Sequence, residues 1–298
     1  MKKIISLVNL IANKEIVPEM LADRFIFDVE NGNPNGDPDA GNAPRIDSES
    51  GYGYVTDVCL KRKIRNYVEL VKEGEAGYNI LIKPDKALNS KFTAAYEAEG
   101  LKTKNNGRNE DDVKKARAYM CKNYYDVRTF GAVMSTGNDP CGIVRGPVQL
   151  NFARSISPID IEDITITRQA RTTDERQETG QTEMGKKSII PYALYRAEGY
   201  VSAALANKTT DLSEADLELL WEAIINMFEN DHSAARGKMC MRKLYVFKHS
   251  NILGNCPSHL LFEKIKVDEE NEIPRCFDDY KIEVDEKMPE GVELIEKL

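Results

Sequence analysis

The residues best suited to binding chemistry are four cations that follow a loop rich in small and polar residues. Lys61, Arg62 and Lys63 are consecutive, and Arg65 lies two positions later. The preceding residues 31–53 are dense in Gly, Asn, Asp and Pro. Lysine and arginine supply positive charge and several hydrogen-bond donors to phosphate oxygens. Loop N–H groups at the positive end of a helix hold phosphates as well. The pattern therefore predicts a polyanion-binding site.

The elements that position these cations follow from the hydrophobic pattern. Residues 25–29 are a short apolar run that predicts a buried strand. Thr56 or Asp57 can cap a helix that begins after the loop. The apolar positions of this helix recur at steps of four, three and four at Leu60, Ile64, Tyr67 and Val71. The four cations then lie on the opposite side of its first turns. An ordinary amphipathic helix with a solvated basic face explains the spacing equally well.

The literal residues of this region resemble those of a known family. NGNPNGDPDAGNAPRID at residues 31–47 and VTDVCLKRKIRNYV at residues 55–68 are similar to the backbone subunit of type I CRISPR surveillance (Cascade) complexes. The type I-C form, a member of the RAMP superfamily, is the most similar. The similarity continues at residues 145–152, 164–170, 191–195, 248–249 and 254–259. It covers residues 24–267, which is most of the chain.

The resemblance implies an α+β fold, in which a modified ferredoxin-like or RRM-like body carries a helical insertion and a protruding β-hairpin thumb. We expect this body at residues 24–267, with the insertion at about 84–140 and the thumb at about 168–187. Residues 1–23 are an N-terminal segment of uncertain order, and residues 268–298 form an acidic C-terminal segment. Periodicity by itself indicates only a mixture of helices and strands.

Further elements are predicted from local patterns. Strands are expected at residues 78–83, 143–153, 164–167, 188–195, 242–248 and 260–267, with no strand after these. Helices are expected at residues 84–99 and 111–125, and residues 130–142 are expected to be a connection. Ser213 and Asp216 form a capping-box pattern at the start of another helix. Trp221 lies on the apolar face of that helix, which places the single tryptophan in the core.

The residues between two of these strands are almost entirely polar. Composition alone favours a mobile surface loop at 168–187. The resemblance implies instead a thumb that folds over guide RNA bound to the next subunit and distorts it at regular intervals. Met184 is the one residue of this segment suited to wedge between bases. The aromatic signature of an ordinary RRM is absent, so we expect RNA to be held through its backbone and shape.

The function implied by the resemblance is non-catalytic. Copies of the chain stack head to tail along one guide RNA (crRNA) and present it for pairing with target DNA. The implied partners are crRNA, target DNA through the guide, further copies of the chain, the large subunit and the crRNA-handle-binding subunit, with no membrane and no cofactor. The residues implied to bind RNA are Asn35, Arg45, Lys61, Arg62, Arg65, Arg168, Arg171, Met184, Lys186 and Lys187.

The charge distribution is compatible with this function. A net charge of −8 is by itself unfavourable for binding nucleic acid, but residues 263–298 contain 13 acidic and 6 basic side chains. The rest of the chain is therefore nearly neutral, and local field rather than total charge binds phosphate. The acidic segment is most simply a solvated edge, and an electrostatic contact with a neighbouring subunit is the alternative.

Other constellations are weaker. Residues 33–44 alternate like a calcium loop but have proline where an EF-hand needs glycine and a carboxylate, so a rigid turn is expected. His249, Cys256 and His259 match no zinc-module spacing, and no metal site is predicted. His249 and His259 could act as general acid and base, so a RAMP endoribonuclease that processes CRISPR precursor RNA is the alternative function. A structural pair of histidines, or an interface contact, is the preferred interpretation.

Motif and cysteine patterns narrow the class of protein further. P-loop, nucleophile-elbow and zincin motifs are absent, so the sequence gives no support to those enzyme classes. The six cysteines form no CxxC pair, which fits reduced thiols in a cytoplasmic protein. No apolar run approaches the length of a membrane span, and the apolar residues near the N-terminus lack the cleavage pattern of a signal peptide.

Overall fold

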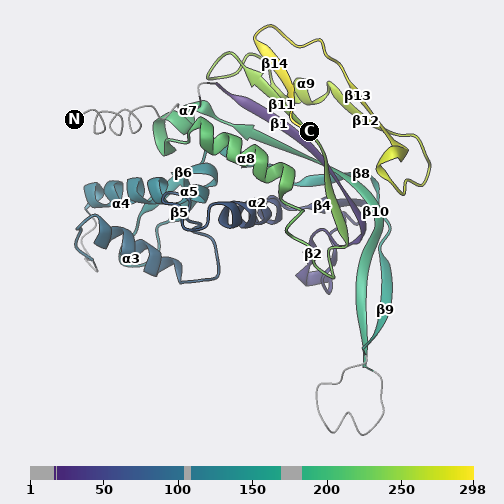
Figure 1. Ribbon diagram of the computed structural model, residues 1–298, viewed down its shortest axis with the longest axis horizontal. Helices are drawn as coiled ribbons and strands as arrows, with labels where there is room; N and C mark the ends of the chain where they lie inside the picture. The colour runs from purple at the N-terminus through teal and green to yellow at the C-terminus, as the bar shows by residue number, and fades with distance from the viewer. Residues whose placement is uncertain (1–16, 18, 104–108, 169–182) are drawn as a thin grey trace, which may run out of the picture.

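A large antiparallel sheet forms the centre of the molecule. The computed structural model describes residues 17, 19–103, 109–168 and 183–298. In this part of the chain the sheet has eight strands. Its three longest strands lie side by side in the order β11 (Lys238–His249), β1 (Leu21–Gly32) and β10 (Glu183–Val201) (Figure 1). β1 contains residues 25–29, so the strand predicted there is confirmed.

The remaining elements surround these three strands. The other strands of the sheet are β4 (Tyr52–Val55), β7 (Val148–Leu150), β8 (Ala153–Pro158), β9 (Glu162–Arg168) and β14 (Val292–Glu296). Separate two-stranded sheets pair β2 (Gly36–Asp37) with β3 (Ala43–Pro44), β5 (Gly131–Met134) with β6 (Gly142–Arg145), and β12 (Ile265–Glu269) with β13 (Tyr280–Val284). The helices are α2 (Asp57–Val71), α3 (Leu88–Ala98), α4 (Glu110–Asn123), α5 (Tyr125–Phe130), α7 (Ala203–Leu205), α8 (Glu214–Asn226) and α9 (Ser258–Phe262). Short turns of helix are η1 (Pro38–Ala40), η2 (Ala206–Thr210) and η3 (Phe277–Asp279).

Both faces of the sheet are covered at β1, and this explains why residues 25–27 of this strand are apolar without alternation. Successive side chains of a strand point to opposite faces, so a strand buried on both sides has no polar face. Phe25 and Phe27 belong to the main core with residues of α2 and α8. Ile26 belongs to a second core, on the other face, with residues of α9 and the β12–β13 hairpin. Trp221 is buried in the main core, as predicted.

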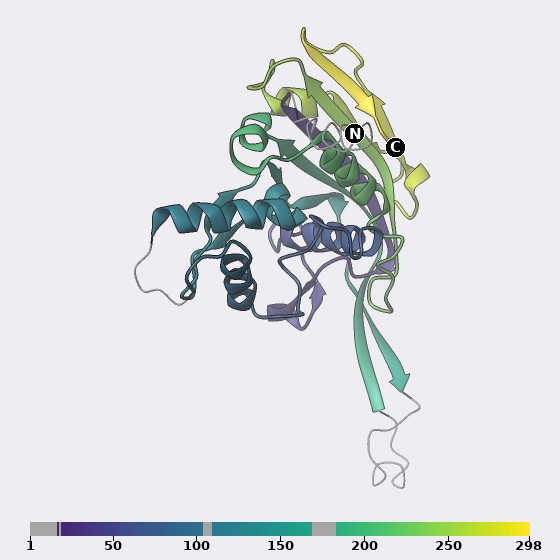
Figure 2. The ribbon, with the colours of Figure 1, turned by 60° about the vertical axis from the view of Figure 1, so that its left-hand side comes forward.

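The outer half of β10 leaves the body. Its residues 183–189 pair with β9, whereas its later residues pair with β8 and β7 and, along the opposite edge, with β1. The β9–β10 pair projects as a long hairpin in both views (Figures 1 and 2). The strands of this hairpin extend further toward its tip than the sequence pattern indicated, because β10 begins at Glu183 instead of residue 188.

A smaller unit of helices lies beside the body. α3, α4 and α5 pack with the β5–β6 hairpin around a separate apolar cluster that includes Phe92, Met120 and Val127, and α3 and α4 lie at one side of the molecule (Figure 1). Gly131 begins the hairpin at φ 79°. A Cβ atom there would lie 2.4 Å from the Val144 carbonyl oxygen, so this turn requires glycine. No helix in the described ranges is long and apolar enough to cross a membrane.

Three sequence predictions are wrong in this region. Residues 78–83 form no named strand, because the Leu81 and Ile82 N–H groups donate to the Asp126 carboxylate instead of a neighbouring strand. Residues 130–142 are not a simple connection, since they contain β5 and start β6. Val71 of the predicted apolar stripe is exposed, and Val68 is buried in its place.

The C-terminal part also differs from the prediction. Residues 260–267 begin in α9 and reach a strand only at Ile265. Two later strands were missed, and β14 extends the main sheet by pairing with β11. Their sequences, YKIEV and VELIE, are short and carry charges between the apolar positions. Strand pairing with distant segments, rather than local propensity, decides their structure.

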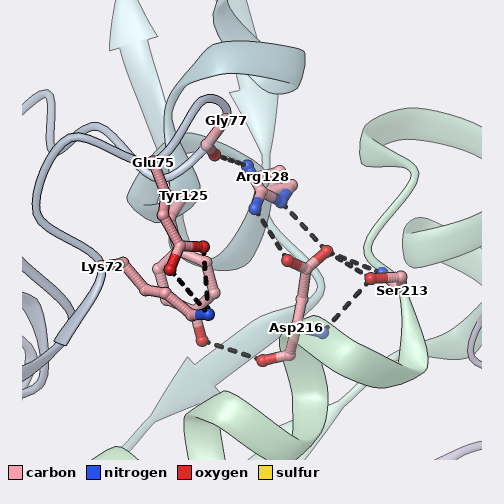
Figure 3. A network of polar contacts seen from close by, with 7 residues as sticks. All are labelled: Lys72, Glu75, Gly77, Tyr125, Arg128, Ser213 and Asp216. Atoms are coloured by element: carbon pink, nitrogen blue, oxygen red, sulfur yellow. Dashed lines mark hydrogen bonds and ion pairs between the residues drawn. The ribbon is translucent and has the colours of Figure 1, made fainter.

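A buried polar network fixes α5 to α8 (Figure 3). The Arg128 guanidinium donates to both oxygens of Asp216, at 3.0 and 2.7 Å, and to the Gly77 carbonyl at 2.5 Å. Ser213 and Asp216 form the predicted capping box at the start of α8. Burial raises the pKa of Asp216, but the hydrogen bond and charge of Arg128 outweigh it and leave this pKa below its usual range. The network joins segments far apart in sequence and holds the helical unit on the body.

Candidate nucleic-acid interface

The start of α2 is tied to the loop before it by Asn35. Thr56 is the N-cap, and its Oγ1 accepts a hydrogen bond from the Cys59 N–H at 3.3 Å. The Asn35 side-chain oxygen accepts from both the N–H and the hydroxyl of Thr56, each at 3.0 Å. Asn35 therefore positions the loop against the positive end of the helix. Because the Asn35 side-chain oxygen accepts both of these hydrogen bonds, the N–H groups of its amide are left for another partner.

The loop itself is a compact turn. β2 and β3 pair across η1, and the Asn42 N–H donates to the Asp37 carbonyl at 2.7 Å. The Asn33 side chain donates to the Asn42 carbonyl, also at 2.7 Å. Arg45 forms an ion pair with Asp37 at 3.4 Å. These bonds give the rigid turn that the spacing of Asn and Asp residues indicated.

The four cations of α2 have different surroundings, and the predicted basic face is only partly present. Lys63 is buried and forms an ion pair with Asp231, and Arg65 is buried with its Nε 2.9 Å from Asp126. The turn after α8 covers one flank of α2, and α5 covers the other. The alternative of an ordinary helix with a solvated basic face is therefore wrong for Lys63 and Arg65, which are not available at the surface as the predicted polyanion site requires. Burial lowers the pKa of Lys63, although the hydrogen bond to Asp231 opposes this.

Lys61 and Arg62 remain nearer to solvent. Lys61 is half-buried, forms an ion pair with Asp57 at 2.8 Å and lies 5.7 Å from the centre of the Phe130 ring. Arg62 is exposed and has no ion-pair partner among the residues that the structure describes. Of the four, Arg62 is thus the cation whose donors are free to reach a ligand.

A second segment, not found by sequence reasoning, adds to this surface. The turn at residues 231–237 lies against the loop, since the Ala235 carbonyl accepts from the Asn33 N–H at 2.9 Å. It brings Arg236, which pairs with Asp231, into the neighbourhood of Arg45. These cations lie close enough to Cys59 to affect its pKa. Burial raises the pKa of the Cys59 thiol, and the positive charges of Lys63, Arg236 and Arg45 oppose that rise. Arg45 and Arg236 are 191 positions apart in the sequence, so no local pattern could have joined them.

The projecting hairpin has two different faces. Directly opposed residues of an antiparallel pair share a face. Met184, 75% exposed, lies opposite Thr167, and the exposed Lys186 lies opposite Thr165. Lys187 is half-buried and lies on the other face, opposite Ile164. This second face also carries the exposed Ile166, and sequence reasoning missed both isoleucines as candidates.

Two further thumb residues, Arg168 and Arg171, were predicted to bind RNA. Arg168 ends β9, where its backbone pairs with Glu183. Arg171 lies outside the described residues. The hairpin points away from the body that carries α2 (Figure 1), so one copy of the chain does not bring the thumb residues together with Arg62.

The histidine pair does not form an acid–base site in this structure. His249 is fully buried, and its Nδ1 accepts a hydrogen bond from the Asn255 N–H at 2.9 Å. Burial also lowers the pKa of His249, which favours the neutral ring as a support for the turn. His259 lies exposed on α9. Across the described ranges, no three His, Cys, Asp or Glu residues gather as metal ligands would.

Comparisons with known proteins assign the chain first to the CRISPR-associated proteins. The family model for CRISPR-associated protein Cas7 matches residues 23–285, so the chain belongs to the Cas7 family. A curated relative, CRISPR-associated protein Cas7 of Haloferax volcanii, is 27% identical over 243 residues, which are 74% of this chain and 68% of that protein. The family resemblance found in the sequence is confirmed.

Two solved structures were also compared with the chain. A chain of a CRISPR RNA-guided surveillance complex in a pre-nicking state is 13% identical, with a TM-score of 0.48 and 82% of each chain covered. A chain of another CRISPR RNA-guided surveillance complex is 13% identical, with a TM-score of 0.44, and the match covers 76% of this chain and 68% of that one.

Proposed function

We propose that this chain is the non-catalytic backbone subunit of a type I-C Cascade complex in the cytoplasm. Copies bind crRNA, stack head to tail along it and present it for pairing with target DNA. The large subunit and the crRNA-handle-binding subunit are the other proposed partners. The match of the Cas7 family model to residues 23–285 is the observation that carries the proposal. The expected division into an RRM-like body, a helical insertion, a thumb and an acidic C-terminal segment forms part of it.

The geometry supports contact with phosphates at the start of α2. Arg62 is exposed there, beside the loop that Asn35 fixes to the helix. Arg45 and Arg236 lie nearby, and each shares its charge with an aspartate. We propose Arg62 as the principal phosphate contact, with Lys61, Arg45 and the Asn35 amide in support. Arg65 is bound to Asp126, so we assign it the positioning of α2.

Endoribonuclease activity finds less support. A general acid or base must reach a substrate proton, and His249 is buried with one ring nitrogen already hydrogen-bonded. The scaffold function needs no such group. We therefore retain guide binding without cleavage as the proposal.

The test is the salt dependence of RNA binding by wild type and by Arg62→Glu. Single-stranded RNAs of unrelated sequence should bind the variant more weakly and to the same degree, because phosphates carry no sequence information. The slope of log K against log salt should fall by about 0.7 for each phosphate that the variant no longer binds. Lys287→Glu, an equal charge change at an exposed site near β13, is the matched control and should bind as wild type does. Weaker binding confined to one RNA sequence would contradict the proposal.

A further inference from the structure

An exposed aromatic surface lies on β4, the strand that leads into α2, and on its partner β8 together with Phe152, the residue before β8. Phe152 is 55% exposed and is the one phenylalanine with a largely exposed side chain in the described part of the chain. Its ring stacks nearly parallel to that of Tyr54, with 6.1 Å between centroids and 6° between planes. Beside them, the guanidinium of Arg154 lies 4.8 Å from the centre of the Tyr52 ring. These four side chains line one face of the β4–β8 pair.

The opposite face of the same strands is core, which fixes the orientation of this surface. Val55 and Ala153 oppose each other across β4 and β8, and both are fully buried in the main core. Tyr54 and Arg154 form the next pair and point the other way. The stacked rings therefore face outward, and burial of apolar area does not explain an exposed phenylalanine here.

A pair of like charges continues this face onto β10. Arg196 lies directly opposite Arg154 in the β8–β10 pairing. Arg154 donates to the Ser50 hydroxyl at 3.2 Å and lies 3.8 Å from Asp47, whereas the Arg196 side chain forms no hydrogen bond or ion pair with any described residue. Like charges directly opposite each other destabilise a sheet. An anion bound between the two guanidinium groups would remove that repulsion.

We infer that the face formed by Tyr52, Tyr54, Phe152, Arg154 and Arg196 binds single-stranded nucleic acid. A base stacks on the Phe152–Tyr54 rings, and the neighbouring phosphate lies between Arg154 and Arg196. Single-strand binding surfaces combine these two elements, an aromatic ring for the base and cations along the backbone. The RNA is then held by base stacking as well as by its phosphates, which the sequence did not lead us to expect.

This surface meets the proposed phosphate site across the edge strand β4, because Tyr54 faces away from α2, which packs on the other face against Val55. The Tyr54 N–H donates to the Arg45 carbonyl at 3.1 Å, and β4 runs directly into the N-cap of α2. The inference rests on the proposed function, because the nucleic-acid strand that crosses the loop and α2 is the one that passes round the β4 edge onto the rings. Single-stranded RNA and single-stranded DNA share the chemistry of base and phosphate, so the experiment must compare the two.

The experiment measures binding of fluorescein-labelled single-stranded RNA and DNA of one sequence, over a range of salt, to the full chain. Phe152→Ala should weaken RNA binding about fivefold or more, because it removes a stacked base, and should leave the salt slope unchanged. Phe152→Trp keeps a ring on which a base can stack and should bind RNA about as tightly as wild type. Arg196→Gln should instead lower the salt slope by about 0.7. Leu253→Ala, at another exposed apolar side chain, is the matched control and should have no effect.

An RNA with abasic sites separates stacking from charge. Wild type should prefer the intact RNA, and Phe152→Ala should lose that preference, since no ring remains on which a base can stack. A preference for RNA over DNA assigns the surface to the guide, and equal affinity assigns it to single strands in general. If wild type binds RNA but Phe152→Ala binds it equally well, the stacking surface is wrong and the proposed function stands. If wild type binds no RNA, both are wrong.

Discussion

Burial divides the cations of α2 into two kinds with different consequences on mutation. Arg65 is paired with Asp126 inside the protein, whereas Arg62 lies in solvent. Removal of one partner from a buried ion pair destabilises a protein by about 3–5 kcal/mol, because the other charge is left unpaired. Weaker RNA binding by an Arg65 variant could therefore result from unfolding of the protein as well as from the loss of a cation that contacts RNA. Arg62 is the position at which binding can be measured without this complication.

Asp23 is a buried carboxyl group that makes stability depend on pH. Neither of its oxygens has a hydrogen-bond partner among the described residues. Burial, with a further contribution from the charge of Glu198, raises its pKa from 3.8 to about 7. The folded state therefore holds this proton at pH values where the unfolded chain has released it. Stability falls as pH rises from about 4 to about 7 and is constant above that, so far as this group is concerned.

Asp23→Asn should remove this dependence. The amide cannot ionise, so the free energy of unfolding of the variant should exceed that of wild type by up to about 4 kcal/mol above pH 7. The two proteins should differ little near pH 4. Thermal unfolding of both proteins at several pH values between 4 and 8 measures the gap. Glu97→Gln, at an exposed acid on α3, is the control and should give no pH-dependent gap. A difference in Tm between wild type and Asp23→Asn that is the same at every pH would contradict the assignment.

Elements with a strong local pattern could be predicted from the sequence, and elements fixed by distant contacts could not. The capping signals of α2 and α8 gave their starts correctly, and the apolar run of β1 gave a buried strand. Residues 78–83 had the composition of a strand, but the Asp126 carboxylate bonds their backbone. β14 was missed because its place in the sheet depends on β11, more than forty residues earlier.

In the candidate site too, residues close together in sequence could be predicted, and residues that only the fold brings together could not. Loop and helix were visible in one continuous stretch, and so Arg62 was found. Arg236 and Phe152 belong to segments that only the sheet brings beside that loop. The spacing of α2 also could not reveal that flanking elements bury Lys63 and Arg65. Helical periodicity defines the face that points to the core, but it does not say how far neighbouring elements cover its sides.

The projecting hairpin can be removed with little effect on the body. Asp163 and Ser188 pair directly, so residues 164–187 can be replaced by an Asn-Gly turn that suits a two-residue hairpin. Ile164 and Ile166 are exposed, and the shortened chain should therefore keep its Tm within a few degrees. It should still bind a short RNA but fail to form multi-copy assemblies on a long one. Light scattering after size exclusion measures the assembly, and unchanged assembly would contradict a role for the thumb.

Charge is separated across the whole molecule. The acidic C-terminal residues form β12, β13 and β14, which cover one face and one edge of the sheet. The loop, α2 and the 231–237 turn lie with the helices on the other face. A chain with a net charge of −8 thus offers a local cationic surface. The acidic region lies apart from the α2 surface, but β12 borders β8 beside the aromatic face, where the Ser157 hydroxyl donates to Glu269.

The most direct test of the central claim is to purify the chain at low salt with a nuclease inhibitor. Its size-exclusion profile and 260/280 nm absorbance ratio are then compared with those of Lys61→Glu/Arg62→Glu. We predict that wild type elutes as a large species with bound RNA and that the double variant elutes as a small species free of nucleic acid. The same large RNA-bound species in both proteins would contradict the placement of the site on α2. A wild-type chain that is small and free of RNA, even after guide RNA is added, would contradict the scaffold function itself.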